Sequence, residues 1–490
     1  MFNIPVHFFI NHEVKVEQNA KEELARLLQI NETIERIRDF DTSYFKSDAG
    51  VTEVAITPDF HKGAGIPVGT TLFTRGMAIP QAIGNDINCG MRLYVTNLTE
   101  EKIRNHLDEI EKKIRYVFFE GGRNIPMTRR MREKLFTEGL IGLLETFSDV
   151  KGKGLWNHYD AKQQESDLNR VNKLGSFIAD EAVALDDFLG PEGISHDSQI
   201  GSIGGGNHFV EIQVVREIKN SSVAHAWGLR KGQVVFMIHT GSVAIGHHAG
   251  NHIRQMMRDM YPKNLKHPEN GIYPLPHSDR FQSQWQQFWN HLHNAANFAF
   301  ANRLTLGLML HKAISDVVGD FEQELLYDAP NNYLWEETID NTNGFLHRKG
   351  SCTAKSPEQM QGTPFAYTGE PVFIPGSMGS HSFILAGLGN RNSLFSASHG
   401  AGRALSRGEA VKVDDVKFRG FIEKFRVINP IDPKRTDLRG RMDILKKWEE
   451  ELKKEAPYAY KEITPIIQSH VDFGMADIVA EVAPIATVKG

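Results

Sequence analysis

The fold class is decided by the stretch Gly204-Gly205-Gly206-Asn207-His208-Phe209-Val210-Glu211-Ile212-Gln213-Val214-Val215. Its second half is rich in β-branched and apolar residues, which favour a strand. Its glycines let the backbone come close to a phosphate or a metal without a side chain in the way. Two further runs of the same character, residues 92–95 and 234–238, also predict strands. We therefore expect a β-sheet whose strands adjoin glycine loops that stay open to a ligand.

Helical periodicity is clear elsewhere in the chain. Apolar residues recur at helical spacing over residues 103–114, and Thr99 is placed to cap that helix. We also expect a polar helix over residues 161–189 and an aromatic-rich helix over residues 278–310. No internal repeat or low-complexity linker interrupts the sequence. We predict an α+β fold, a single large mixed domain over residues 1–490 with a β-sheet core and peripheral helices.

The charge balance gives no direct sign of a nucleic-acid partner. The 490-residue chain has a net charge of −5, so an RNA or DNA contact would have to rely on a local basic patch. The sharpest basic run covers residues 411–426. That run is equally typical of a solvated surface of mixed charge.

The cysteine content and the N-terminal sequence indicate the cellular compartment in which the protein works. Cys89 and Cys352 are too few for a disulfide framework and favour a reducing environment. Residues 1–10 lack a basic leader and a small-residue cleavage site, so they indicate a strand instead of a signal peptide. No apolar run approaches the ~20 residues that span a bilayer. We expect a cytoplasmic protein with no membrane partner.

Candidate metal ligands lie beside the glycine loops. Asp86 and Cys89 are three positions apart in one turn, a spacing that lets both side chains face one ion, and His208 and His239 supply imidazoles. A thiolate can donate to two metals at once, and two metals ~3.5–4 Å apart suit phosphoryl chemistry. Zinc would bind such ligands readily and manganese more weakly, so availability must decide the ion. The alternative is that Cys89 is a small buried hydrophobe and both histidines are hydrogen-bonded polar residues.

A candidate nucleophile lies in the loop Ser398-His399-Gly400-Ala401-Gly402-Arg403. An imidazole nitrogen is a competent nucleophile toward a phosphoryl group. Considered alone, this histidine could simply end a strand. Together with three other glycine loops that carry histidine or cysteine, at residues 86–91, 204–209 and 238–242, it indicates a metalloenzyme that handles phosphates.

Several long motifs of the chain match those of a known family and follow one another in the same order. They are residues 58–63, 84–91, 204–211, 239–242, 295–297, 302–303, 347–350, 374–379, 398–403 and 488–490. In these motifs the chain resembles the RtcB RNA ligases, GTP- and manganese-dependent enzymes that rejoin broken or spliced RNA. The resemblance runs through nearly the whole length and implies an RtcB-like fold. It also implies RNA with broken or spliced ends as the substrate, and it leaves open whether an activating protein takes part.

The resemblance assigns roles to individual residues. His399 would attack the α-phosphate of GTP, and the guanylate would pass to an RNA 3′-phosphate before a 5′-hydroxyl displaces GMP. Family members also open a 2′,3′-cyclic phosphate first. Asp86, Cys89 and His208 match ligands of one manganese, and Cys89 and His239 match ligands of the second. The positions that match the guanylate site are Asn207, His208, Phe209, Val210, Glu211, Asn332, Pro375, Gly376, Ser377, Met378, Ser382, Gly400, Ala401, Gly402 and Lys489. Among them, Glu211 and Lys489 can read a purine edge by hydrogen bonds.

Two positions depart from the family pattern. Asn331 stands where the last metal-binding histidine is expected, and an amide oxygen ligates manganese more weakly than an imidazole. We expect a second manganese site of reduced affinity. Val243 stands where the family usually has an arginine that clamps a phosphate, so RNA-end binding must differ. Two alternatives stay open: a manganese phosphohydrolase acting on cyclic phosphate ends, and a non-catalytic RNA-binding relative.

Overall fold

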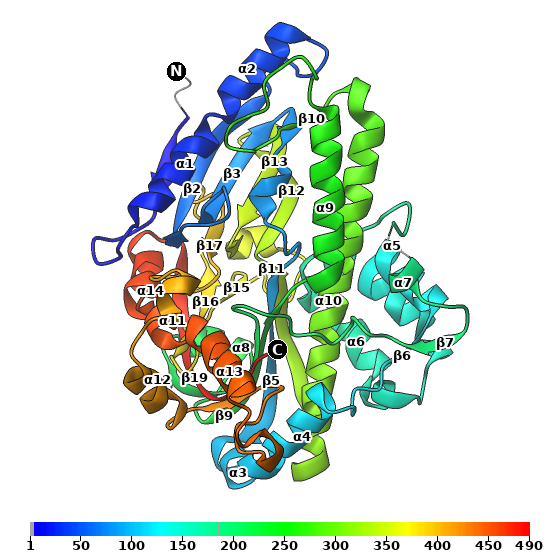
Figure 1. Ribbon diagram of the computed structural model, residues 1–490, viewed down its shortest axis with the longest axis vertical. Helices are drawn as coiled ribbons and strands as arrows, with labels where there is room; N and C mark the ends of the chain where they lie inside the picture. Colours follow the sequence, from blue (N-terminus) through cyan, green and yellow to red (C-terminus); the bar gives the residue numbers. More distant parts are fainter. Residues whose placement is uncertain (1–3, 184–185) are drawn as a thin grey trace.

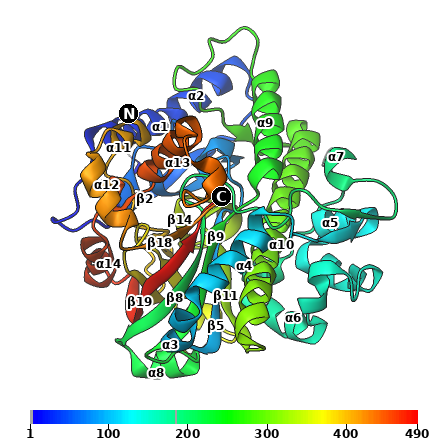
Figure 2. The same ribbon diagram turned by 60° about the horizontal axis from the view of Figure 1, so that its bottom comes forward.

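The β-branched runs of the sequence form the strands of two large sheets (Figure 1). The computed structural model describes residues 4–183 and 186–490. The larger sheet has the order β11 (Gln323–Pro330), β5 (Gly90–Thr99), β9 (Gln233–Thr240), β8 (Phe209–Ile218), β19 (Ala476–Val488), β16 (Ser382–Gly387) and β15 (Pro371–Ile374), with β18 (Arg426–Ile428) paired to β19. Figure 2 shows β19 running along β8, to which it pairs antiparallel.

The smaller sheet has the order β1 (Val6–Phe8), β2 (Gly50–His61), β3 (Val68–Arg75), β13 (Thr342–Lys349) and β12 (Asn332–Ile339). Because β11 ends at Pro330 and β12 begins at Asn332, Asn331 is the single residue between strands of different sheets. Short two-stranded pairs complete the strands: β4 (Met77–Ala78) with β10 (Leu275–Pro276), β6 (Pro126–Thr128) with β7 (Ile194–His196), and β14 (Ser351–Thr353) with β17 (Ser396–Ser398).

Helices surround the sheets, and one long helix is largely buried. The middle of α10 (Gln282–Val318) is buried on all sides, and α9 (Val243–Met260) runs beside it in both views (Figures 1 and 2). The other helices are α1 (Gln18–Leu28), α2 (Ile30–Phe40), α3 (Glu100–Asn105), α4 (Leu107–Phe119), α5 (Arg129–Thr146), α6 (Ala161–Asp167), α7 (Asp186–Leu189), α8 (Ser221–Ala226), α11 (Arg407–Val411), α12 (Asp415–Ile422), α13 (Met442–Lys454) and α14 (Ile463–Asp472). The arrangement confirms the predicted α+β class.

The prediction of one continuous helix over residues 161–189 is wrong. The helix α6 ends at Asp167, and the chain continues through short 3₁₀ turns in which Lys173 and Leu174 have φ angles of 52° and 56°. A right-handed helix cannot continue through residues in that conformation. The last part of the prediction includes residues 184–185, which lie outside the described residues.

Other predicted elements are confirmed with shifted ends. The aromatic-rich helix begins at Gln282, after a 3₁₀ turn, and extends to Val318. The helix expected over residues 103–114 is divided at His106, and Thr99 does cap its first part by accepting from Lys102 N at 3.3 Å. The N-terminal strand covers only Val6–Phe8, and residues 1–3 lie outside the described residues. In the described part of the chain, no helix is both long and apolar enough to cross a membrane.

Candidate active site and metal centre

Strand register brings the predicted metal ligands together. Antiparallel pairing sets Phe209, at the start of β8, opposite His239 near the end of β9. The start of β5 pairs with the same end of β9, so Cys89, which precedes β5, arrives there as well. His208 precedes Phe209 and completes the group. The ends of three neighbouring strands therefore carry one cluster, although its members are far apart in sequence.

A cavity of about 830 Å³ opens beside this cluster. Its walls include most of the predicted site residues: Asp86, Cys89, Asn207, His208, Phe209, Glu211, His239, Asn331, Asn332, Pro375, Gly376, Ser377, Met378, His399, Gly400, Ala401, Gly402 and Lys489. Val210 and Ser382 are buried behind the wall. Ser382 supports it, because its hydroxyl accepts from Gly376 N at 3.2 Å.

The cluster has the geometry and the donor types of a metal centre. Cys89 Sγ lies 3.1 Å from His239 Nε2 and 3.4 Å from His208 Nε2. The ligand atoms of these three residues lie within 4.8 Å of one another. Asp86 adds a carboxylate, since its Oδ2 lies 2.8 Å from His208 Nε2. A thiolate, two imidazoles and a carboxylate around one point can hold a divalent ion.

The buried amide of Asn331 supports the same interpretation. Asn331 is 1% exposed and lines the cavity, yet neither Oδ1 nor Nδ2 has a hydrogen-bond partner among the described residues. An unsatisfied buried polar group costs about 1–3 kcal/mol. A cation beside Oδ1 would satisfy that oxygen, so the residues present fit a metal ion. The neighbouring Asn332 has no such freedom, because its Oδ1 accepts from Gly350 N at 2.7 Å.

Burial sets the protonation of the cluster. The pKa of the Cys89 thiol is raised well above its usual value by burial and by the charge of Asp86. Burial lowers the pKa of His239 well below its usual value. A neutral imidazole is the form that ligates metals, whereas a thiol must first lose its proton. A metal bound at this cluster would therefore displace a proton from Cys89.

Arg303 of α10 ties the ligand-bearing segments together. Its Nη1 donates to the carbonyl oxygen of Asn88 at 2.7 Å and to that of Thr240 at 2.9 Å. Each of these residues is next to a predicted metal ligand in the sequence. Asp328 forms an ion pair with Arg303, with Oδ1 2.8 Å from Nη2 and both side chains fully buried. Because its hydrogen bonds end beside two ligands, Arg303 fixes their spacing.

The loop after His239 closes around Asp86. Val243 N lies 3.3 Å from Asp86 Oδ1, to which it donates a hydrogen bond. The φ angle of Val243 is 48°, a strained value for a β-branched residue. A Cβ added at Gly241 would lie 2.5 Å from Asp86 Oδ1, so any larger residue there would displace that carboxylate. This loop holds the carboxylate in place at the expense of backbone strain.

The candidate nucleophile is held by a residue that the sequence analysis did not single out. His399 Nδ1 lies 2.6 Å from Asp59 Oδ2, and Asp59 is fully buried at the end of β2. Thr57 Oγ1 donates to the other carboxylate oxygen at 2.6 Å. Burial acts to raise the pKa of Asp59, but the hydrogen bond and charge of His399 outweigh it and leave that pKa below its usual value. An ionised Asp59 orients the imidazole and leaves Nε2 to react.

The cavity wall also carries a buried acid and a buried amine. Burial raises the pKa of Glu211 to about 7, against hydrogen bonds from Thr487 and Gln213. Burial also lowers the pKa of Lys489 to about 8. Lys489 Nζ donates to the carbonyl oxygen of His208 at 2.7 Å. Both groups can change protonation near neutral pH, and both face a pocket large enough for a nucleotide.

Three contributors could not be identified from local sequence. Asp59 lies inside the motif of residues 58–63, but nothing in that motif shows that it contacts His399. Thr487 Oγ1 donates to Glu211 Oε1 at 2.5 Å from the last strand. Glu455 lies in the cavity wall and pairs with Arg403 at 3.2 Å. Each depends on a contact between distant segments.

Comparisons with known proteins agree with this geometry. A family model described as tRNA-splicing ligase RtcB matches residues 45–490. The tRNA-splicing ligase RtcB of Thermococcus kodakarensis is 33% identical over 454 residues, covering 89% of this chain and 87% of that protein. The tRNA-splicing ligase RtcB of Pyrobaculum aerophilum is 32% identical over 457 residues, with coverage of 89% and 87%. The RNA-splicing ligase RtcB of Mycobacterium bovis is 31% identical over 446 residues, with coverage of 88% and 96%.

A buried cysteine–histidine cluster at the ends of sheet strands, beside a large cavity, is the arrangement of a metal-dependent enzyme. The chain belongs to the tRNA-splicing ligase RtcB family. The predicted resemblance is therefore confirmed.

Proposed function

We propose that the protein is a cytoplasmic RNA ligase, formed as one unit by residues 1–490. It joins an RNA end with a 3′-phosphate or a 2′,3′-cyclic phosphate to a 5′-hydroxyl end, and it uses GTP and Mn²⁺. The observation that carries this proposal is the 2.6 Å contact between Asp59 and His399 on the wall that also bears the metal-type cluster. An oriented imidazole beside a site for cations is suited to nucleotidyl transfer.

In the first step His399 is the nucleophile. Its Nε2 forms a bond to the α-phosphorus of GTP while the bond from that phosphorus to the pyrophosphate oxygen breaks, and pyrophosphate leaves with the electron pair. Asp59 accepts the hydrogen bond from Nδ1 and stabilises the positive charge that develops on the ring. A phosphoramidate between His399 and GMP results.

In the following steps the guanylate activates the RNA end. An oxygen of the RNA 3′-phosphate bonds to the guanylate phosphorus, and the bond to His399 Nε2 breaks. The 5′-hydroxyl oxygen then bonds to the 3′-phosphorus, its proton passes to solvent, and GMP leaves with the electron pair. A cyclic phosphate must first be opened by water to give the 3′-phosphate.

The metal would neutralise phosphate charge during these steps. We assign Asp86, Cys89 and His208 to one Mn²⁺ and Cys89, His239 and Asn331 to a second. The unsatisfied amide of Asn331 supports this second assignment. Because an amide is a weaker ligand than an imidazole, we expect the second ion to bind with lower affinity.

The guanylate would lie along the remaining cavity wall. Ionised Glu211 can accept hydrogen bonds from the guanine N1–H and amino group, and protonated Lys489 can donate to its carbonyl oxygen. The loop of residues 375–378 and the loop of residues 400–402 supply mostly small side chains and backbone groups in the wall that also carries His399. They would hold the ribose and phosphates.

A joining assay tests the proposal. One RNA strand carries a 3′-phosphate and the other a 5′-hydroxyl, and the full chain is supplied with GTP and Mn²⁺. Joined product from the wild type, none from His399→Ala and none from strands with 3′-hydroxyl and 5′-phosphate ends would support it. Opening of a cyclic phosphate without joining would instead indicate a phosphohydrolase, and no reaction would indicate a non-catalytic RNA-binding protein.

A further inference from the structure

A second cavity adjoins the catalytic one and is lined by cations. Its volume is about 350 Å³, and its walls include Arg254, Arg258 and Lys349. Ala64 and Lys349 line both cavities, so the two are neighbours. No carboxylate lines the second cavity within the described residues. We call it the α9 basic cavity.

One stripe of α9 connects the two cavities. Val243, His247, Gly250, Arg254 and Arg258 follow at spacings of four, three, four and four residues, which places them on one helix face. The first two line the catalytic cavity and the last two line the α9 basic cavity. At a rise of 1.5 Å per residue, Arg254 lies about 16 Å along the helix from Val243. The stripe therefore runs from the metal-type cluster to the two arginines of the α9 basic cavity.

Arg254 is aimed back toward the catalytic loop. Its guanidinium donates to the side-chain oxygens of Asn85 and Asn251. Asn85 directly precedes Asp86. Neutral amides position the guanidinium without cancelling its charge, so Arg254 stays available to an anion.

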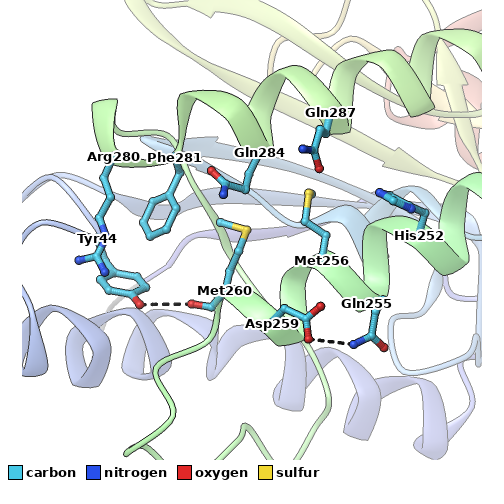
Figure 3. Close-up of a pocket in the computed structure, with 10 residues that line it drawn as sticks. All are labelled: Tyr44, His252, Gln255, Met256, Asp259, Met260, Arg280, Phe281, Gln284 and Gln287. Carbon is cyan, nitrogen blue, oxygen red and sulfur yellow. Dashed lines mark hydrogen bonds between the residues drawn. The ribbon is translucent and has the colours of Figure 1, made fainter. Parts of the chain in front are cut away.

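The opposite side of α9 shows how an arginine is neutralised in this protein. A cavity of about 470 Å³ lies on that side. Figure 3 shows His252, Met256 and Asp259 of α9 among the residues that line it. Its arginine, Arg280, lies 4.3 Å over the ring of Tyr44 and forms an ion pair with Asp41. That cavity contains a carboxylate and a paired cation. The contrast marks the α9 basic cavity as the anion-binding side of the helix.

We propose that the α9 basic cavity binds backbone phosphates of the single-stranded RNA whose end reacts at His399. The inference rests on the proposed function, and it names where the strand runs once it leaves the reacting end. Phosphate contacts from Arg254 and Arg258 position the strand without reading its sequence. They also supply positive charge that Val243 does not supply at the start of the same helix stripe.

RNA binding at different salt concentrations tests this inference. The full chain is titrated onto a labelled single-stranded RNA with a 3′-phosphate, and the association constant is measured between 50 and 300 mM salt. We expect the Arg254→Gln/Arg258→Gln variant to bind about tenfold more weakly, with a log–log salt slope smaller by roughly 1.4, since each single-strand phosphate contact contributes about 0.7. The matched control is Arg230→Gln/Lys231→Gln, which removes the same charge from an exposed turn at the other end of β9. The control should bind within about twofold of the wild type.

The single variant Arg258→Gln controls for misfolding of the double variant, because Arg258 is exposed and its replacement leaves the packed side of α9 unchanged. It should lower the salt slope by roughly 0.7. Any of three results would overturn the inference. The double variant could bind as tightly as the wild type, the control could lose as much affinity as the double variant, or the wild type could fail to bind RNA. A protein that joins RNA ends with unchanged binding in the double variant would refute only this inference. A protein that binds RNA through both arginines but joins nothing would refute only the proposed function.

Discussion

Asp59 Oδ2 and His399 Nδ1 lie 2.6 Å apart although the two residues are 340 positions apart in the chain. Asp59 comes from the end of β2 in the smaller sheet, and His399 follows β17. The fully buried carboxylate can only orient the ring and balance its charge, since its two oxygens are occupied by His399 and Thr57. Reactivity of His399 should therefore depend on Asp59.

Asp59→Asn should slow guanylylation of His399 roughly 10²–10⁴-fold, because an amide does not stabilise the charged ring and favours the wrong tautomer. The measurement is the rate of label transfer from GTP to the protein. Thr57→Val is the matched control, since it removes a hydrogen bond from Asp59 but keeps its charge, and it should lose less than about tenfold. A rate in Asp59→Asn within threefold of the wild type would contradict the assigned role.

Asn331→His should tighten binding of the second Mn²⁺ about tenfold, because an imidazole is the stronger ligand for a transition metal. Manganese titration followed by calorimetry or by the signal of free Mn²⁺ measures this directly. Asn331→Ala should weaken the same site without changing the first. Identical titrations for the histidine variant and the wild type would count against Asn331 as a ligand.

Gly241→Ala should weaken metal binding at least about tenfold, because the new Cβ would lie 2.5 Å from Asp86 Oδ1 and must displace that carboxylate. Gly420→Ala is the control, since a Cβ at that position meets open space. Metal content after dialysis distinguishes the two variants. If Gly241→Ala retains its metal as well as Gly420→Ala does, Asp86 is not a ligand that this loop holds in place.

The larger elements of this protein could be predicted from sequence, because they depend on local patterns. The strand after Gly206 and the helix cap at Thr99 each depend on residues within a few positions. The metal-type cluster could also be anticipated, because each candidate lies beside a glycine loop. The contact of Asp59 with His399 and the clamp of Arg303 on Asn88 could not, since each joins segments that only the strand order brings together. The helix expected over residues 161–189 failed for a local reason, the positive φ angles near Lys173.

Stability should respond to the protonation of Glu211. The pKa of Glu211 is about 7 in the folded protein and 4.5 when unperturbed. Between pH 4.5 and pH 7 the folded state therefore keeps a proton on Glu211 that the unfolded state has lost. The free energy of unfolding therefore falls as pH rises from 4.5 to 7, by about 3 kcal/mol from this group. Glu211→Gln removes that loss. Relative to the wild type, the variant should gain stability between pH 5 and pH 8 in denaturant unfolding, and an unchanged difference would show that Glu211 is not held protonated.

The central claim is that His399 carries the guanylate. The most direct measurement is incubation of the full chain with α-labelled GTP and Mn²⁺, followed by denaturing electrophoresis and mapping of the labelled residue. A labelled band that is acid-labile, alkali-stable, absent in His399→Ala and mapped to His399 is the predicted result. No labelled band at any manganese concentration, or a label that persists in His399→Ala, would contradict the account.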